Sequence, residues 1–277
     1  MRNADRVRRL NSRIMTALTA LCTLLAVGAL LFILSYIAIQ GIGSLSLQFL
    51  TDRPRPVGEG GGIGNAILGS LVLLSLSSAI GLPLGICVGV YLSEVGRGRM
   101  GSAVRFIVDT LTGIPSIVTG VFVYAILVVP TKHFSALAGG VALAMIMIPI
   151  VARTTEEMLK LVPHSLREGA LALGAPQWRV TIGVIIPAAA PGIATGAMLA
   201  IARVSGETAP LLFTAIGSRF FPTSLNEPIA SLTVQIYNYA ISPYDEWHAQ
   251  AWAATLVLMT LVLGINIIVR FLTRRRY

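Results

Sequence analysis

Two ionisable side chains, Arg203 and Glu207, interrupt an otherwise apolar stretch of the chain, Pro187–Gly217. A charged group within an apolar segment long enough to span a membrane is costly, and it is by default a candidate functional residue. The guanidinium of Arg203 presents paired N–H donors that match an oxyanion. Glu207 would repel a dianion unless it holds Arg203 in place or accepts a proton from the ligand. Phosphate that retains a proton can donate to a carboxylate, whereas sulfate at neutral pH cannot. The pair therefore predicts a path for an anion, with Glu207 favouring phosphate.

A weakened helix is expected at the level of these two charges. Pro210 removes the hydrogen bond to the carbonyl of Gly206, and Gly206 itself adds backbone freedom. At 1.5 Å per residue, Arg203 lies about 17 Å along the helix from Gly192, near the middle of a hydrocarbon core roughly 30 Å thick. The alternative interpretation is a self-neutralising pair that locks two helices together. Arginine preceding glutamate by four residues is the less favourable order within one helix.

A second candidate site lies in the polar segment 153–186, which separates two long apolar runs. Ser165 and Glu168 have the spacing of a capping box, which predicts a short helix over about Leu166–Leu173. Gly174 can close that helix. Such a helix could fill a groove on a soluble partner, and the alternative is a solvated amphipathic connector.

The elements that carry both sites are expected to be membrane-spanning helices. Hydrophobic residues make up 55% of the 277 residues and charged residues only 12%, which excludes an ordinary soluble domain. A spanning helix needs roughly 20 apolar residues, and six segments qualify: Ile14–Ile39, Ala66–Ser93, Phe106–Pro130, Phe134–Ala152, Pro187–Gly217 and Ala249–Val269. We therefore predict an all-α membrane protein with six transmembrane helices. Pro83, Pro115, Pro149 and Pro210 are expected to kink them, and Pro115 and Pro210 are the candidate helix breaks.

The distribution of lysine and arginine predicts the orientation. With both termini cytoplasmic, the segments expected outside hold only Arg53, Arg55, Lys132 and Arg219 of the 21 lysine and arginine residues, and Arg203 is intramembrane. This bias also accounts for the net charge of +9 without nucleic-acid binding. The basic ends are expected to lie against anionic lipid headgroups.

No catalytic or metal-binding constellation is recognisable in the sequence. Cys22 and Cys87 fall singly within apolar segments, where a packing role is the usual one. There is no Cys/His cluster, no phosphate-binding Gly-Lys-Ser loop and no nucleophile elbow. The chain is therefore not expected to hydrolyse ATP or to bind a cofactor or metal itself.

The segment around Glu168 resembles a known motif. Glu168-Gly169-Ala170, then Gly174, then Val184-Ile185-Ile186-Pro187 is similar to the EAA loop of type I ABC importer permeases, although Gly169 replaces the usual first alanine. The resemblance implies a cytoplasmic coupling helix that docks into a separate ATPase subunit. ATP and Mg²⁺ would then be bound on that partner chain.

A longer resemblance narrows the class. The run Ala202–Ala215 resembles the fifth-helix signature of PstA-type permeases of phosphate ABC importers, and the Glu-Thr-Ala-Pro-Leu-Leu string within it separates them from the sister PstC subunit. Gly61–Asn65, Gly113–Val118 and Gln235–Tyr239 also resemble that family. The resemblance implies a PstC-like second permease subunit, a PstB-like ATPase dimer and an extracytoplasmic PstS-like phosphate-binding protein. It also implies that Arg203 and Glu207 line the phosphate pathway.

The expected organisation is a basic cytoplasmic N-terminus (1–13), a first transmembrane helix with an external loop (14–60), a permease core (61–272) and a basic cytoplasmic tail (273–277). Three other functions are compatible with parts of the sequence. They are an ABC permease for sulfate, molybdate or a phosphonate, a carrier driven by an ion gradient, and an enzyme acting on lipid phosphate. The EAA-like loop argues against the carrier, and the lack of a catalytic constellation argues against the enzyme.

Overall fold

The computed structural model describes the backbone of residues 2–274 and the side chains of residue 8 and residues 11–271. This part of the chain is helical without a β-strand, and its only strand-like features are the bridges Pro54–Gly61 and Ile216–Ile229. The α-helices are α1 (Arg2–Ile42), α2 (Leu47–Thr51), α3 (Gly64–Glu94), α4 (Gly98–Gly113), α5 (Ser116–Val123), α6 (Val129–Thr131), α7 (Ala136–Lys160), α8 (His164–Ala172), α9 (Gln177–Val180), α10 (Ile186–Ser205), α11 (Ala209–Thr214), α12 (Leu232–Ala240) and α13 (Asp245–Arg274). Two π-helical turns, η1 (Tyr124–Val128) and η2 (Thr181–Ile185), continue α5 and α9.

Five helical segments of the described chain are long and apolar enough to cross a membrane, and a bent pair makes a sixth. The bent pair corrects the prediction of a continuous third span, because α4 and α5–α6 meet at an angle of 105°. Pro115 stands at this bend as the residue before α5. Its ring cannot follow a helical residue without a clash, so Ile114 adopts an extended conformation instead.

The fifth predicted span, Pro187–Gly217, is also interrupted. The helix runs without a break from Gln177 to Ser205 and stops there. After three non-helical residues, 206–208, the chain resumes as α11. Pro83 and Pro149, in contrast, lie within the continuous helices α3 and α7. Proline therefore breaks two of the four segments that contain it.

The core is built on the pair α3 and α7, which form the most extensive helix–helix contact. Gly81, Gly85 and Gly89 lie one turn apart on α3, and a Cβ on Gly85 would approach Val151 Cβ to 2.7 Å. A Cβ on Gly89 would approach Thr155 Cβ to 2.5 Å. Small residues at this spacing let membrane helices pack closely, so this stripe fixes the axis against which the other helices are placed.

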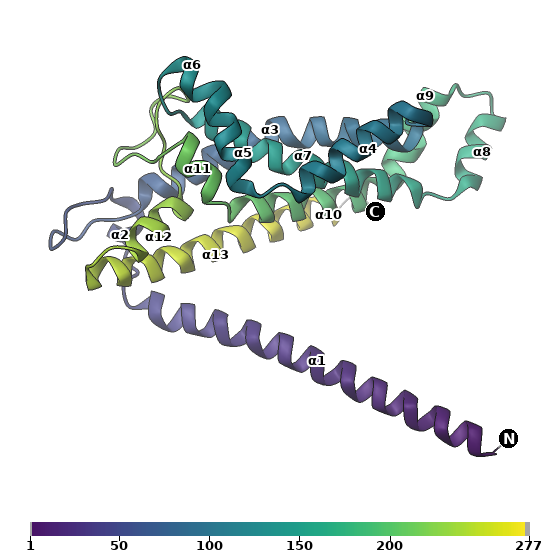
Figure 1. Ribbon diagram of the computed structural model, residues 1–277, viewed down its shortest axis with the longest axis horizontal. Helices are drawn as coiled ribbons and strands as arrows, with labels where there is room; N and C mark the ends of the chain where they lie inside the picture. The colour runs from purple at the N-terminus through teal and green to yellow at the C-terminus, as the bar shows by residue number, and fades with distance from the viewer. Residues whose placement is uncertain (1, 275–277) are drawn as a thin grey trace.

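The arrangement along the long axis separates two ends of the molecule (Figure 1). α8 lies at one end, on the same side as the first residues of α1, and α13 runs toward this end but stops short of it (Figure 1). The connections that precede α7 and α12 lie at the opposite end (Figure 1).

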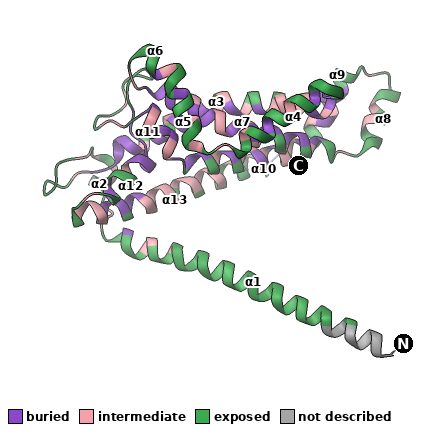
Figure 2. Cartoon of the chain, viewed as in Figure 1, coloured by how far each residue is buried: buried purple, intermediate pink, exposed green. Residues whose placement is uncertain are grey.

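Helix α1 diverges from the bundle and is exposed along most of its described length (Figure 2). Only its C-terminal part packs, against α13. There Tyr36 meets Trp252 edge-on at 5.3 Å, and a Cβ on Gly41 would lie 2.8 Å from the carbonyl oxygen of Trp252.

Candidate functional site

Arg203 and Glu207 form an ion pair at the interruption of the fifth span. Arg203 lies in the last turn of α10, where the helix dipole favours a cation. Its guanidinium donates to the carboxylate of Glu207, which lies beyond the end of the helix. The Glu207 side chain is 6% exposed, whereas that of Arg203 is 58% exposed. The guanidinium of Arg203 is therefore accessible to a ligand while it stays hydrogen-bonded to the buried carboxylate of Glu207.

This geometry bears on the alternative interpretation, in which Arg203 and Glu207 only neutralise each other and lock two helices together. The two side chains do form an ion pair, so mutual neutralisation stays open as an account of the resting state. Because α10 ends at Ser205, the helical order of arginine before glutamate does not disfavour the pair as the sequence suggested. The role of the two residues in a substrate path stays a prediction.

The helix break is anchored to α12 through its main chain. Thr233 Oγ1 donates to the carbonyl oxygen of Glu207 at 2.9 Å, and Ser70 Oγ accepts the Leu232 amide at 2.8 Å. Both contacts are buried. A buried main-chain carbonyl needs such a partner, so Thr233 stabilises the non-helical conformation around Gly206. Sequence reasoning did not find Thr233.

The predicted helix breaks at Gly206, Pro210 and Pro115 coincide with the ends of helices. Gly206 caps the C-terminus of α10, Pro210 lies in the first turn of α11, and Pro115 precedes α5. The two broken spans also meet, because α5 packs against α11. A Cβ on Gly120 would lie 2.5 Å from the Cα of Pro210.

A helix is present in the polar loop as predicted, α8, but it begins earlier than expected. It starts at His164, and its N-cap is Pro163 without a side-chain capping hydrogen bond. The capping-box prediction for Ser165 and Glu168 was therefore wrong. Pro163 ends α7 and, with a fixed φ and an extended ψ of 135°, itself supplies the start of the next helix.

The end of α8 follows the prediction. Gly174 adopts a φ of +80°, and its amide donates to Leu171 O at 2.9 Å. The Ala175 amide donates to Ala170 O at 3.4 Å, which completes a Schellman motif. Only glycine adopts this conformation without strain.

Some of the other residues predicted to couple to the ATPase are exposed, and others pack against the bundle. Glu168 and Gly169 are exposed, and a Cβ on Gly169 would meet nothing within 4 Å. Ala170 packs against the cluster around Leu159 and Ile185. Pro187 lies in the first turn of α10, directly after the π-helical turn η2.

A buried ion pair that the sequence did not reveal fixes α8 to the bundle. Arg167 on α8 donates to both carboxylate oxygens of Glu94, the last residue of α3, one of them at 2.9 Å. The Glu94 side chain is 3% exposed. Its hydrogen bonds raise the pKa of Arg167, which keeps the guanidinium charged. No local pattern could indicate this pair, because its members lie far apart in the sequence.

A second buried carboxylate, Glu156, ties α4 to α7 at the same end. It is 0% exposed and accepts from Arg105 at 2.7 Å, from Lys160 at 2.5 Å and from Arg153 at 3.2 Å. Arg105 also donates to the carbonyl oxygen of Leu92 at the end of α3. Buried polar contacts therefore connect α3, α4, α7 and α8 at this end of the molecule.

The comparisons with known proteins agree with this architecture. Residues 81–276 match the family of binding-protein-dependent transport system inner membrane components. The fold is similar to a methionine ABC transporter in inward-facing conformations, with a TM-score of 0.58 and 22% identity over 77% of this chain and 94% of that one. It is also similar to a bacterial ABC transporter involved in alginate import, with a TM-score of 0.63 and 16% identity over 92% of this chain and 96% of that one. The chain therefore has the fold of ABC importer permeases.

Three relatives narrow the class further. The chain is 46% identical to the phosphate transport system permease protein PstA of Yersinia pestis, over 97% of this chain and 92% of the relative. It is 44% identical to PstA of Pasteurella multocida, over 95% and 94%. It is 39% identical to the probable PstA of Methanocaldococcus jannaschii, over 96% and 94%. The chain therefore belongs to the PstA family of binding-protein-dependent transport system inner membrane components.

Proposed function

We propose that this chain is the membrane-spanning permease subunit of an ATP-driven importer of inorganic phosphate. The observation that carries the proposal is the similarity to phosphate permeases over nearly the whole of both chains. Arg203 gives the substrate assignment a physical basis, because its exposed guanidinium lies at the interruption of a spanning helix.

The orientation in this proposal places α8 and both termini in the cytoplasm. It is supported by the lysine and arginine bias, by the position of α8 at the same end as the first turns of α1, and by the direction of α13, which runs toward that end (Figure 1). The opposite end of the bundle would then face the outside, and the basic termini would contact membrane lipid.

The energy in this proposal enters through α8. Its free surface carries exposed apolar side chains, including Leu166, Leu171 and Leu173, which would dock into one subunit of a PstB-like ATPase dimer. ATP and Mg²⁺ would be bound there, and this chain would be non-catalytic. Movement of α8 would reach α3 through Arg167 and Glu94.

Two further partners complete the proposed assembly. A PstC-like second permease subunit would form the other half of the pathway. A PstS-like binding protein would deliver phosphate to the outer end. Phosphate would then displace Glu207 from Arg203 or bridge the two, with its remaining proton donated to the carboxylate.

The test is the initial rate of labelled phosphate uptake in cells that lack this chain. The cells are complemented with the wild type, with Arg203→Gln, or with Arg99→Gln, which removes an exposed arginine near the start of α4. Wild type and Arg99→Gln should restore uptake that excess sulfate and molybdate do not inhibit, and Arg203→Gln should not. Uptake that does not depend on the chain would remove the substrate assignment. Equal rescue by Arg203→Gln would show that Arg203 is not needed in the phosphate path, and it would leave the substrate assignment in place.

A further inference from the structure

Three of the four cationic side chains predicted to lie outside converge on one place. Arg53 and Arg55 come from the loop that follows α2, Arg219 comes from the loop that follows α11, and the fourth, Lys132, lies elsewhere. External arginine and lysine are disfavoured by the positive-inside rule. The convergence of two separate loops on one cationic spot therefore needs a reason beyond topology.

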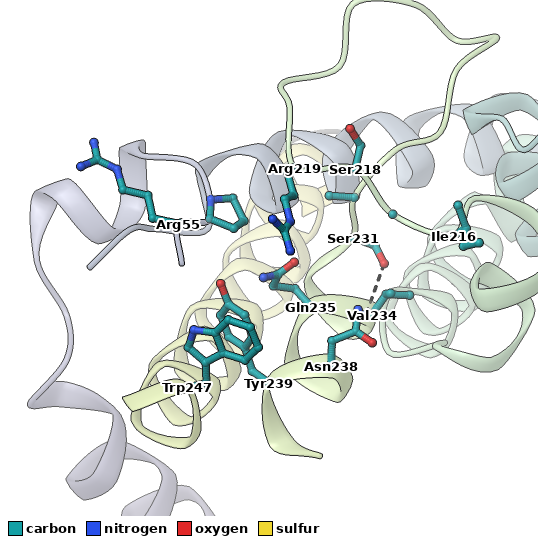
Figure 3. A pocket seen from close by; sticks show the side chains of 13 residues that line it. Arg55, Ile216, Ser218, Arg219, Ser231, Val234, Gln235, Asn238, Tyr239 and Trp247 are labelled. Atoms are coloured by element: carbon teal, nitrogen blue, oxygen red, sulfur yellow. Dashed lines mark hydrogen bonds between the residues drawn. The ribbon is translucent and has the colours of Figure 1, made fainter. Parts of the chain in front are cut away.

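Next to this spot lies a cavity of about 360 Å³ between the loop at Pro54–Arg55, the segment 216–219, α12 and the start of α13, which Arg55 and Arg219 line but Arg53 does not (Figure 3). This volume is within the range of roughly 300–1,000 Å³ that small-molecule sites occupy. None of the thirteen residues that line it carries a carboxylate. A neighbouring cavity of about 430 Å³ shares Pro54, Arg55 and Arg219 and adds Arg53 and Glu59.

Arg219 supplies the least compensated charge. It takes part in no ion pair found within the described residues, and its guanidinium is directed toward Gln235 (Figure 3). Arg55 is paired with Asp52 at 3.0 Å, so its charge is partly offset. Arg53 lies over the ring of Phe220 at 5.6 Å.

Neutral donors complete the lining. Trp247 contributes to the lining, but its Nε1 is closed to solvent and has no hydrogen-bond partner among the described residues. Burial raises the pKa of Tyr239, so its hydroxyl keeps its proton. Gln235 and Asn238 add carboxamide donors to the same lining.

One residue lies between this cavity and the helix break. Ser231, the N-cap of α12, lines this cavity and also a small internal cavity of about 10 Å³ that Glu207 helps to line.

We propose that this cavity, the outer anion pocket, binds inorganic phosphate before it reaches the helix break. The proposal rests on the function proposed above and adds a second, external site to it. Arg219 is the charge contact. The uncharged donors Gln235 and Asn238 bind the remaining oxygens.

The test measures protection of a cysteine placed in the pocket. Ser218→Cys, at a lining residue to which no phosphate contact is assigned, is introduced with Cys22→Ser and Cys87→Ser into the assembled transporter in membrane vesicles, after confirming that this background imports phosphate. The rate at which a membrane-impermeant thiol reagent modifies residue 218 is measured over a range of phosphate concentrations, with sulfate at matched ionic strength as comparison.

Phosphate should slow the modification in the absence of binding protein, and sulfate should do so less. In Arg219→Gln, the phosphate concentration for half-protection should rise about tenfold, as expected for loss of one charge-assisted hydrogen bond. In Lys132→Gln, which removes an outer charge away from the pocket, it should not change.

Three results would overturn the pocket. They are no protection by phosphate, equal protection by sulfate, and protection that appears only when binding protein is added, which would mark a protein contact. Each of them leaves the proposed function in place if uptake stays phosphate-specific. If phosphate protects the cysteine but the transporter imports a different anion, the proposed function is contradicted and the proposal of an outer anion pocket stands.

Discussion

Gly120 on α5 packs against Pro210 on α11 so closely that a Cβ on Gly120 would lie 2.5 Å from the Cα of Pro210. Each helix follows the break in its own span, at Pro115 and at residues 206–208. The obstacle is main chain, which cannot rotate away as a side chain can. The absence of a side chain at Gly120 therefore allows the two interrupted spans to be joined beyond their breaks.

Gly120→Ala should weaken this joint. Overpacking of a tight contact costs about 1–3 kcal/mol, so the thermal-unfolding midpoint of the purified transporter should fall. The matched control is Gly264→Ala in α13, where a Cβ would meet nothing within 4 Å. Both changes gain the same helix propensity, so the difference between them isolates the contact. Equal midpoints would show that α5 and α11 are not held at this distance.

The helical elements were predictable because their signals are local. Apolar runs of membrane length located the spans, and Pro115 and Pro210 located the breaks in two of them. Gly174 located the end of α8 because one residue type satisfies that backbone conformation. The start of α8 was misplaced because Pro163 supplied the cap that the spacing of Ser165 and Glu168 had suggested.

The contacts between elements were not predictable from one sequence. Arg167 was visible only as a polar residue of the loop, and its partner Glu94 lies at the end of another helix. The same holds for Thr233, which binds the carbonyl oxygen of Glu207, and for Arg219 in the outer anion pocket. Such pairs depend on how helices are placed in three dimensions, which local periodicity does not encode.

Arg167→Gln should reduce the phosphate imported per ATP hydrolysed, because α8 loses its charged link to α3. It should also lower stability by about 3–5 kcal/mol, the usual cost of leaving a buried charge without its partner. The measurement is ATP hydrolysis and phosphate uptake by the same proteoliposomes, together with the thermal-unfolding midpoint.

Two variants separate the coupling effect from the stability effect. The double variant Glu94→Gln/Arg167→Gln removes the buried charge, so the midpoint should recover while coupling stays low. Arg179→Gln removes an arginine that lies over Trp178 at 5.1 Å, and it should change neither quantity. Normal coupling in Arg167→Gln would show that α8 transmits its movement by another route.

Leu173→Asp should prevent assembly with the ATPase subunit. The Leu173 side chain is 90% exposed beside α8, so a carboxylate there leaves the fold of this chain intact but would be buried without a partner in an apolar groove. Co-purification of the ATPase should be lost, and the amount of this chain in the membrane should not change. Leu225→Asp, an exposed leucine in the loop between α11 and α12, is the control and should retain the ATPase. Retention of the ATPase by Leu173→Asp would place the docking surface elsewhere on the chain.

Glu207→Gln should weaken the discrimination between phosphate and sulfate. The carboxylate accepts the Arg203 guanidinium at the helix break and is 6% exposed, so any anion that reaches Arg203 meets a buried negative charge. Protonated phosphate can donate a hydrogen bond to that charge, whereas sulfate at neutral pH can only be repelled. A glutamine removes the charge while its carbonyl still accepts from Arg203. Excess sulfate should therefore inhibit labelled phosphate uptake by Glu207→Gln and leave wild-type uptake unchanged.

Asp109→Asn is the matched control, because it also neutralises a carboxylate, but an exposed one on α4. Sulfate should not inhibit phosphate uptake by this variant. Full uptake with undiminished rejection of sulfate in Glu207→Gln would assign the discrimination to other residues.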